Sequence, residues 1–310
     1  MRTPWHATVV RSASHLLATV YWNAKLTISH QAIALLVSFI WGTNFVFIRY
    51  GLDELAPFTF AALRFVFVAF PLIVFFPRPD TSWLKLAGYG FFIGFGQFGL
   101  LYWVMQENIT PGLASLIVQM QVFFTVLLAA LLSREIVRPL QLVALALSFA
   151  GLMLIIVFTD GYTTHLGVAV VLVAALSWAC GNMIVKNAGQ VDILAFIVWS
   201  ALFSIPPLVL MAWYFDGVQG IAADLQHASW KAWGVVLWQS VGNTLIGYGL
   251  WNLLLNRYSA AIVTPWALLV PVFGMSASAL LLAEPLPWWK LLAMVLIVAG
   301  LALNMLANRK

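Results

Sequence analysis

Residues 258–304 read YSAAIVTPWALLVPVFGMSASALLLAEPLPWWKLLAMVLIVAGLALN, and a weaker copy of this pattern occurs earlier in the chain, at residues 109–155. At a constant offset of 149 residues Glu284 aligns with Glu135, and in both copies a glycine follows sixteen residues after the glutamate. Each copy consists of an apolar stretch, a polar break at the glutamate and a second apolar stretch. The recurrence predicts that the chain is built from two copies of one structural unit.

The composition indicates a membrane protein. Of the 310 residues, 63% are hydrophobic and only 8% are charged, whereas an average soluble protein has about 25% charged residues. A helix needs about 20 apolar residues to cross a bilayer, and such runs fill nearly all of the sequence after residue 30. A transmembrane barrel is excluded, because its strands would alternate polar and apolar residues over short segments. The single cysteine, Cys180, leaves no intrachain disulfide.

The apolar runs predict an all-α polytopic membrane protein with ten transmembrane helices. Residues 1–30 contain no acid and no clean signal-peptide core, so we expect a cytoplasmic N-terminal tail or a surface-lying segment there. The ten helices are expected at about 31–50, 56–76, 83–106, 110–133, 138–158, 166–186, 191–215, 231–255, 258–282 and 286–307. The longest connecting loop is expected at 216–230.

The distribution of Lys and Arg predicts the orientation of the chain. With a cytoplasmic N-terminus, eleven of these residues lie on the cytoplasmic side and three on the other, namely Arg49, Lys231 and Lys290. Membrane proteins carry their excess of positive charge in cytoplasmic segments. Both termini are therefore expected in the cytoplasm. The same rule accounts for the net charge of +5, which is no signal for nucleic acid.

The two copies extend to two halves of five helices each, residues 31–158 and 166–307. An odd number of helices per half forces the halves into opposite orientations across the membrane. Inverted repeats of this kind are typical of secondary transporters, which bind substrate near the bilayer midplane where the repeats meet. We therefore predict two inverted five-helix repeats (5+5) around a central cavity.

Motifs of an enzyme are missing from the sequence. All five histidines lie in the tail or in expected loops, and no helix carries a His/Cys/carboxylate set with metal-ligand spacing. There is no glycine-rich phosphate loop. The sequence therefore predicts no enzyme, no catalytic residues, no cofactor and no metal. The acids lie near helix ends, with Glu107 closest to a helix interior, so no midplane carboxylate indicates proton coupling.

Several residues are candidates for structural or gating roles. Arg64 is the one charge inside an expected helix, so its side chain requires a cavity, a partner or backbone carbonyls. It could act as a structural latch between helices or contact the substrate. Pro265 and Pro271 should bend the ninth helix, as a hinge or as a static kink. Glu135 and Glu284 begin turns between paired helices, where capping or pairing with nearby arginines is expected.

Aromatic and amide side chains inside the expected helices are candidates for substrate binding. Any one of them could simply pack or hydrogen-bond between helices, but together they predict a polar and aromatic cavity. In the first helix Trp41 and Asn44 are three residues apart and share a face, as do Trp178 and Asn182 in the sixth. The candidate set is Trp41, Asn44, Phe45, Gln97, Tyr102, Trp103, Gln119, Gln121, Trp178, Asn182, Asn243, Tyr248, Trp251 and Trp266. The fifth and tenth helices carry few polar residues and are expected to face lipid.

Three features together resemble a known family. They are the WGTNF sequence at 41–45, Pro57 followed by Arg64-Phe65, and the glutamates that precede each Ala-Gly-Leu step. In this order, and with the duplication, residues 31–307 resemble the EamA-type drug/metabolite transporter (DMT) superfamily, with similarity to aromatic amino acid exporters of the YddG type. The resemblance implies ten helices, cytoplasmic termini, a central cavity and export through the bacterial inner membrane. One departure is Val122, where many members have proline, while Pro271 is kept.

The function predicted from these features is export of amino acids, chiefly aromatic or neutral ones, by alternating access. Its partners would be a small-molecule substrate and the lipid bilayer, and no nucleic acid; a monomer is compatible with the sequence, which does not fix the oligomeric state. One alternative is a broader efflux carrier for nucleosides, purines or cationic compounds. Another alternative is a non-transporting membrane scaffold or a small channel. The sequence leaves the substrate and the coupling ion open.

Overall fold

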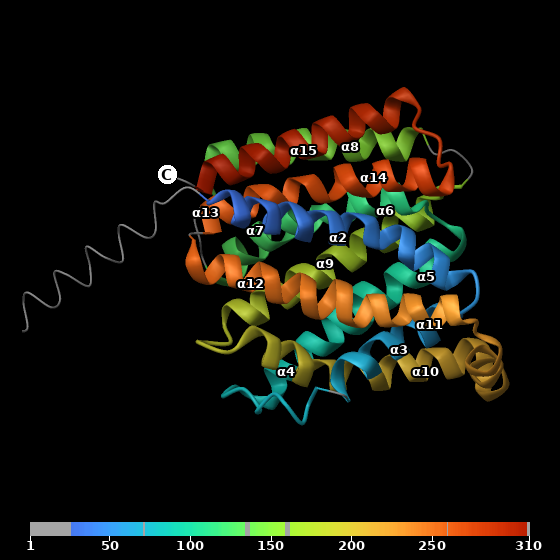
Figure 1. Cartoon of the computed structure of the whole chain (residues 1–310). Helices are drawn as coiled ribbons and strands as arrows, with labels where there is room; N and C mark the ends of the chain where they lie inside the picture. The colour runs from blue at the N-terminus through green and yellow to red at the C-terminus, as the bar shows by residue number, and fades with distance from the viewer. Residues whose placement is uncertain (1–25, 71, 134–136, 159–161, 259, 309–310) are drawn as a thin grey trace, which may run out of the picture.

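The computed structural model describes residues 26–70, 72–133, 137–158, 162–258 and 260–308. Within these residues the chain is helical and contains no strand, and the helices lie side by side in one bundle (Figure 1). Most of the expected tail, residues 1–25, and the candidate residue Glu135 lie outside the described residues.

The two halves of the chain supply the same succession of helices. The first half contains α2 (Ile28–Leu52), α3 (Pro57–Ala69), α4 (Trp83–Tyr89), η1 (Gly90–Gly99), α5 (Leu100–Glu107), α6 (Pro111–Ile117), η2 (Val118–Met120), α7 (Gln121–Ser133) and α8 (Pro139–Val157). The second half contains α9 (His165–Lys186), α10 (Ile193–His227), α11 (Trp230–Leu237), η3 (Trp238–Ile246), α12 (Gly247–Arg257), α13 (Ala260–Val263), η4 (Thr264–Leu268), α14 (Leu269–Leu282) and α15 (Trp288–Asn308). Elements that follow without a gap, such as α4, η1 and α5, form one continuous rod.

Ten rods result within the described residues. Eight are long and apolar enough to cross a membrane, and the others are the short apolar helix α3 and the rod of α11, η3 and α12. Their starts follow from local sequence. Pro57, Pro111 and Pro139 occupy the first turns of α3, α6 and α8, where the missing N–H of proline removes no helical hydrogen bond. The prediction of an all-α membrane protein is confirmed.

Irregular helical segments occur at equivalent places in the two halves. The third rod contains a π-helix, η1, and the eighth contains another, η3. The fourth rod contains a short 3₁₀-helix, η2, and the ninth contains η4. The η4 segment begins at Thr264 and includes Pro265, so the ninth rod departs from α-helical geometry where its first proline predicted a bend. π-Helical segments are rare and frequently lie at functional sites.

The packing of the rods has the symmetry of two interlocked repeats. The first helix of each half packs against the fourth rod of the other half: α2 contacts α14, and α9 contacts α7. The third rods pack crosswise on the second helices, η1 on α10 and η3 on α3. Equivalent helices also meet each other, α3 with α10 and α8 with α15. Helix α9 is the fifth rod after α2, so these equivalent helices run in opposite directions, as predicted for inverted repeats.

Two boundaries differ from the expectation. Helix α3 ends at Ala69 and the chain continues in turns, because a proline follows at position 71 and lacks the N–H that would extend the ladder. The expected loop at 216–230 is largely helical. Gly217 breaks α10 with φ 65°, a conformation that glycine adopts without steric strain, and the helix then continues to His227 (Figure 1).

The segment after Gly217 docks on the turn between α2 and α3. The Asp224 carboxylate accepts a hydrogen bond from the backbone N–H of Ala56 at 2.9 Å. Beside it, Glu54 accepts hydrogen bonds from the backbone N–H and the hydroxyl of Ser229, at 2.9 and 2.8 Å. These two bonds hold the pKa of the Glu54 carboxyl below its ordinary value. The two halves are therefore tied together at this end of the bundle.

Candidate functional site

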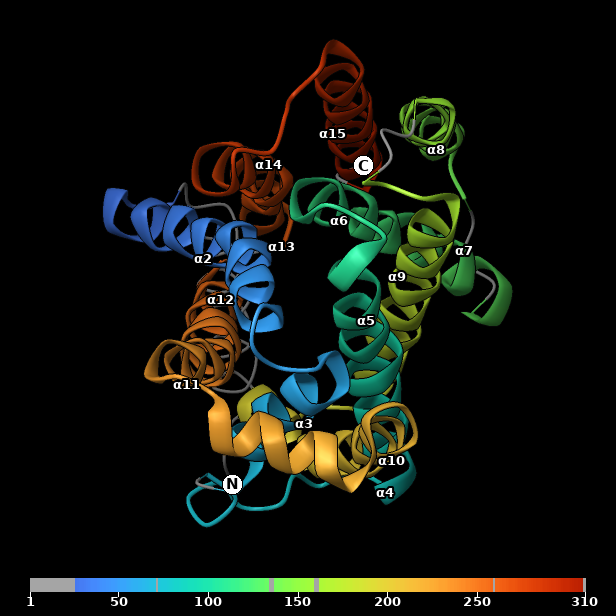
Figure 2. The ribbon, with the colours of Figure 1, turned by 90° about the vertical axis from the view of Figure 1, so that its right-hand side faces the viewer.

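A cavity of about 490 Å³ lies between the two halves. Viewed along the rods, the elements that line it surround the centre of the molecule (Figure 2). Eleven of the fourteen candidate residues line it: Trp41, Asn44, Phe45, Gln97, Gln119, Gln121, Trp178, Asn182, Asn243, Tyr248 and Trp251. They come from both halves, so the cavity belongs to the interface between the repeats. A volume of this size is typical of small-molecule sites.

One part of the wall is aromatic. The ring of Trp41, from α2, lies 5.2 Å from the ring of Tyr248 and 5.2 Å from that of Trp251, both on α12. The Trp41 indole Nε1–H donates to the backbone carbonyl of Asn243 at 3.3 Å, which fixes the orientation of its ring. Such a cluster offers apolar faces and edges against which a planar ligand can stack.

A second part of the wall consists of amides that already have partners in the protein. The Asn182 Nδ2 donates to Gln121 Oε1 at 2.9 Å and to the Thr125 hydroxyl at 3.1 Å. Gln119 Nε2 donates to the backbone carbonyl of Ala267 at 3.5 Å. These bonds join α9 to α7 and η2 to η4, so the three amides hold the helices around the cavity in register.

A third group of amides has unused hydrogen-bonding capacity. Asn44, Gln97 and Asn243 are only 3–4% exposed, and the side-chain oxygen of each has no hydrogen-bond partner. Gln97 lies in η1 and Asn243 in η3, the two equivalent π-helices. A buried polar atom without a partner is destabilising. Three such amides therefore lie beside one cavity with side-chain oxygens that are buried and unpaired in this conformation.

Three candidate residues do not line the cavity. Tyr102 is fully buried and its hydroxyl donates to Gln239 Oε1 at 3.1 Å. Trp103 packs toward Phe215, with 6.5 Å between ring centroids, and its expected place in the cavity wall is wrong. Leu101 does line the cavity, and two residues of α-helix turn a side chain by about 200°, which directs Trp103 elsewhere. Trp266 packs in a separate cluster around Leu254 and Val263.

Sequence analysis missed several residues of the wall. Most are apolar and carried no signal that separates them from lipid-facing positions, for example Phe98 and Val118. Asn304 of α15 could have been found, because an amide within an apolar helix is conspicuous. It lines the cavity and its Oδ1 accepts a hydrogen bond from Gln141 Nε2 of α8 at 3.4 Å. The expectation that the tenth helix faces lipid is therefore wrong for this side of α15, whereas the described residues of α8, the fifth helix, do not line the cavity.

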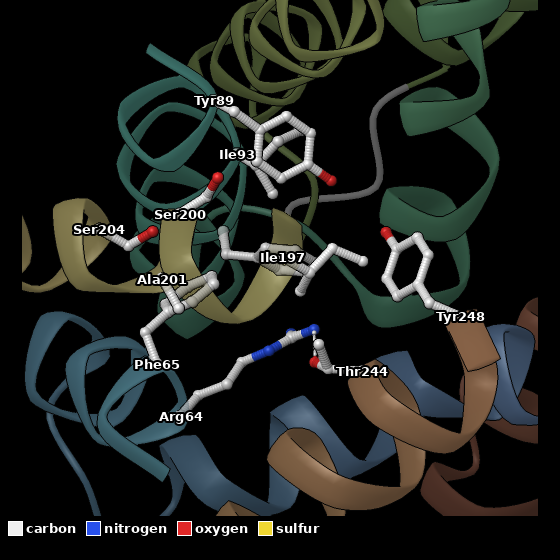
Figure 3. A pocket seen from close by; sticks show the side chains of 11 residues that line it. Arg64, Phe65, Tyr89, Ile93, Ile197, Ser200, Ala201, Ser204, Thr244 and Tyr248 are labelled. Carbon is white, nitrogen blue, oxygen red and sulfur yellow. Dashed lines mark hydrogen bonds between the residues drawn. The ribbon is translucent and has the colours of Figure 1, made fainter. Parts of the chain in front are cut away.

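Arg64 lies beside the cavity and not in its wall. Its guanidinium donates to the Tyr102 hydroxyl at 3.0 Å, to Gln239 Oε1 at 3.1 Å and to the Thr244 hydroxyl at 2.9 Å. Figure 3 shows the side chain extending from α3 toward Thr244, at the edge of a second, small chamber. The bonds connect α3 with α5 and η3, which is the geometry expected of a latch.

Glu284 has a structural environment. Its carboxylate accepts hydrogen bonds from the Thr110 hydroxyl and from the Gly112 N–H at 3.0 Å, and it lies 3.0 Å from the Lys290 ammonium. An acceptor at the first turn of α6 satisfies an N–H that the helix itself leaves open. The buried pair thus fastens α6 to the connection between α14 and α15. Pro271 is buried within α14.

Comparisons with known proteins agree with this architecture. The model of the EamA-like transporter family matches residues 29–157 and 165–306. A protein of Salmonella typhimurium named "Probable amino-acid metabolite efflux pump" is 38% identical over 283 residues, which cover 89% of this chain and 95% of that protein. The Escherichia coli protein of the same name is 37% identical over the same length. A protein of known crystal structure aligns with a TM-score of 0.59 at 19% identity, over 91% of this chain and 99% of its own, which shows a shared fold. With two matched segments that together span nearly the whole chain, the protein belongs to the EamA-like transporter family.

Proposed function

We propose that this transporter exports amino acids, aromatic ones foremost. The observation that carries the proposal is the cavity between the repeats, which combines the rings of Trp41, Tyr248 and Trp251 with amides that lack partners. The rings suit the side chain of an aromatic amino acid, and the amides suit its polar head. The names of the two bacterial relatives, amino-acid metabolite efflux pumps, support this substrate class.

The proposed mechanism is alternating access between the two repeats. Inverted repeats provide two conformations related by the internal symmetry, in which the same central site opens to one side or to the other. The eleven-to-three distribution of Lys and Arg supports cytoplasmic termini. The resulting location would be the inner membrane of a bacterium, with export directed to the periplasm.

Uptake into proteoliposomes tests the function. Purified protein is reconstituted, and a panel of labelled tryptophan, phenylalanine, leucine and glutamate is offered with and without a pH gradient. We expect saturable transport that is strongest for tryptophan and phenylalanine, and that persists without the gradient because the described membrane rods contain no acid in the cavity wall. Protein-free liposomes are the control. Transport of none of the four, or of glutamate alone, would contradict the proposal.

A second candidate is efflux of cationic aromatic compounds. The rings of Tyr248 and Trp251, each 5.2 Å from the ring of Trp41, also suit a cation, which is attracted to the faces of aromatic rings. The same liposomes can be offered a fluorescent quaternary ammonium dye. Competition between this dye and tryptophan for one site would favour a broad carrier, whereas dye transport without competition would point to a separate path.

A further inference from the structure

Arg64 is a buried cation without a carboxylate partner among the described residues. The residue is 1% exposed, and its three hydrogen bonds go to the neutral oxygens of Tyr102, Gln239 and Thr244. Its Nε has no partner at all. Hydrogen bonds to neutral groups orient a guanidinium but do not neutralise it, and an isolated charge inside a membrane protein is costly. The site therefore favours any ligand that brings a negative charge.

Hydroxyl-bearing and apolar residues border the space beside this guanidinium. A chamber of about 20 Å³ is bordered by Arg64, Tyr89, Ser200, Thr244 and Tyr248, and it is large enough for about one water molecule. Figure 3 shows the hydroxyls of Tyr89 and Tyr248 directed into the same region, above the guanidinium. The hydroxyl of Ser200 has no partner. Most of the chamber wall is apolar, formed by residues such as Ile93, Phe98 and Ile197, so the guanidinium and the nearby hydroxyls lie in nonpolar surroundings.

This chamber adjoins the central cavity. Phe98 and Tyr248 line both spaces. The guanidinium carbon of Arg64 lies 3.7 Å from the centre of the Phe98 ring, so a single aromatic ring separates the charge from the cavity. In a site without bulk water the attraction between opposite charges is much stronger than in solution. A negative group held against Phe98 and Tyr248 would therefore experience the positive field of Arg64.

We propose that Arg64 recognises the carboxylate of the transported amino acid. The carboxylate lies at the boundary formed by Phe98 and Tyr248, the ammonium lies toward the part of the wall that carries Asn44 and Asn243, and the side chain stacks within the aromatic cluster. This inference rests on the proposed export of amino acids and adds a selection rule. A ligand must carry a carboxylate, and an aromatic amine without one is rejected although the rings would accept it.

Three ligands that share an indole ring test the rule. Tryptophan has both charges, indole-3-propionate has only the carboxylate, and tryptamine has only the ammonium. Each ligand competes with labelled tryptophan for binding to the reconstituted protein, and the bound label is measured. We expect indole-3-propionate to compete within about tenfold of tryptophan, and tryptamine to compete at least tenfold more weakly than indole-3-propionate, because about 1.4 kcal/mol corresponds to each factor of ten.

Variants test whether Arg64 causes the preference for ligands that carry a carboxylate. Arg64→Gln should bring the apparent affinities of indole-3-propionate and tryptamine together, Arg64→Lys should retain part of the difference, and Arg49→Gln should leave it unchanged. Arg49 is a matched control because it is a partly exposed arginine at the end of α2, paired with Asp53 at 3.3 Å and bonded to the Gln106 carbonyl, away from the cavity wall. Should Arg64→Gln fail to fold, Tyr248→Phe removes the hydroxyl at the boundary, keeps the ring, and should weaken the two carboxylate ligands but not tryptamine.

The outcomes separate this inference from the proposed function. Equal competition by tryptamine and tryptophan in the wild-type protein would overturn the role of Arg64 and leave amino-acid export standing. Competition by indole-3-propionate without any transport of amino acids would support the carboxylate site and contradict the proposed substrate. An unchanged ligand order in both Arg64→Gln and Tyr248→Phe would also overturn the inference.

Discussion

At the scale of single residues, the same amino acid has different surroundings in different parts of the chain. The sequence contains fifteen tryptophans. Trp288 is 61% exposed and touches Phe158 edge-on at the start of α15, a location typical of the interfacial belt of membrane proteins. Trp251, in contrast, packs against Trp41 in the cavity wall. A tryptophan in the wall can contribute to a ligand, whereas one in the belt anchors the protein.

Replacing Trp251 by leucine should therefore weaken transport of tryptophan about tenfold. Stacking on an exposed ring is worth about 1–3 kcal/mol for a nucleic-acid base, and about 1.4 kcal/mol corresponds to a factor of ten. Leucine retains much of the apolar volume, so folding should be preserved. The measurement is the concentration for half-maximal uptake in proteoliposomes. Trp288→Leu is the control, and equal effects of the two changes would show that Trp251 only packs.

The pair of Glu284 and Lys290 provides a test of stability at a single site. Both side chains are almost fully buried, at 5% and 0% exposed, so Glu284→Gln removes a carboxylate that faces a buried ammonium. Loss of one partner of a buried pair costs about 3–5 kcal/mol. We expect a clearly lower midpoint of thermal unfolding in detergent. The double variant Glu284→Gln/Lys290→Met should recover much of the loss, and a double variant as unstable as the single one would speak against a buried pair.

At the scale of helices, close packing depends on a few glycines. A Cβ added to Gly42 of α2 would lie 2.6 Å from Phe273 Cβ and 2.6 Å from the Val270 carbonyl oxygen of α14. Both distances are shorter than van der Waals contact, and a backbone oxygen cannot move without its helix. Gly249 of α12 differs, because its nearest neighbour would be Leu194 Cδ1 at 3.8 Å.

Gly42→Ala should accordingly destabilise the protein, and Gly249→Ala should not. Overpacking of a tight contact costs about 1–3 kcal/mol, while alanine in a helix is otherwise about 1 kcal/mol better than glycine. The midpoint of thermal unfolding should fall for Gly42→Ala and stay constant or rise for Gly249→Ala. If both variants were as stable as the wild type, α2 and α14 would be more loosely packed than the structure shows.

Prediction from sequence succeeded where the helices are regular. Trp41 and Asn44, like Trp178 and Asn182, were expected to share a face because of their spacing, and α2 and α9 are plain α-helices that place them all in the cavity wall. It failed for Trp103, which was a candidate for its aromatic ring and not for its spacing. Leu101 of α5 lines the cavity, and two residues of α-helix turn Trp103 by about 200° from it.

The second failure concerned the expected loop at 216–230, most of which forms the last part of α10. Its Asp216, Asp224 and His227 favoured a loop, since polar residues are common in loops, but the segment forms a helix that docks through Asp224 on Ala56. This contact joins residues 168 positions apart, and only the tertiary fold brings them together. The repeat in the sequence predicts that the chain has two halves, but it does not predict which residues of the two halves contact each other.

At the scale of the whole molecule, the repeats interlock so that no half forms a separate body. The first helix of each half packs on the fourth rod of the other half. The second helices of the two halves contact each other, and so do the fifth helices. A conformational change must therefore move helices of both repeats together. In the proposed mode of transport, such a change would exchange the accessible side of the central cavity without creating a new site.

The orientation of the molecule can be tested with single cysteines. After Cys180→Ala, a cysteine is placed at Asp80, which the charge distribution puts in the cytoplasm, or at Gln219, which it puts in the periplasm; both positions are exposed. A membrane-impermeant maleimide added to intact cells should label the Gln219→Cys variant and leave Asp80→Cys unlabelled until the cells are opened. Labelling of both in intact cells would contradict the inverted arrangement.

The two π-helices have a consequence for the length of the chain. In an α-helix each residue adds about 100° of rotation, so loss of one residue from α2 would turn its remaining part away from the cavity. A π-helix joins residues five apart, and so accommodates extra length within an otherwise α-helical rod. Loss of one residue within Gly90–Gly99 or Trp238–Ile246 can be absorbed by closing the wide turn, while the flanking helices keep their relative rotation. One-residue gaps between this chain and its relatives therefore belong in these two segments, where a change in length leaves the direction of every later side chain intact.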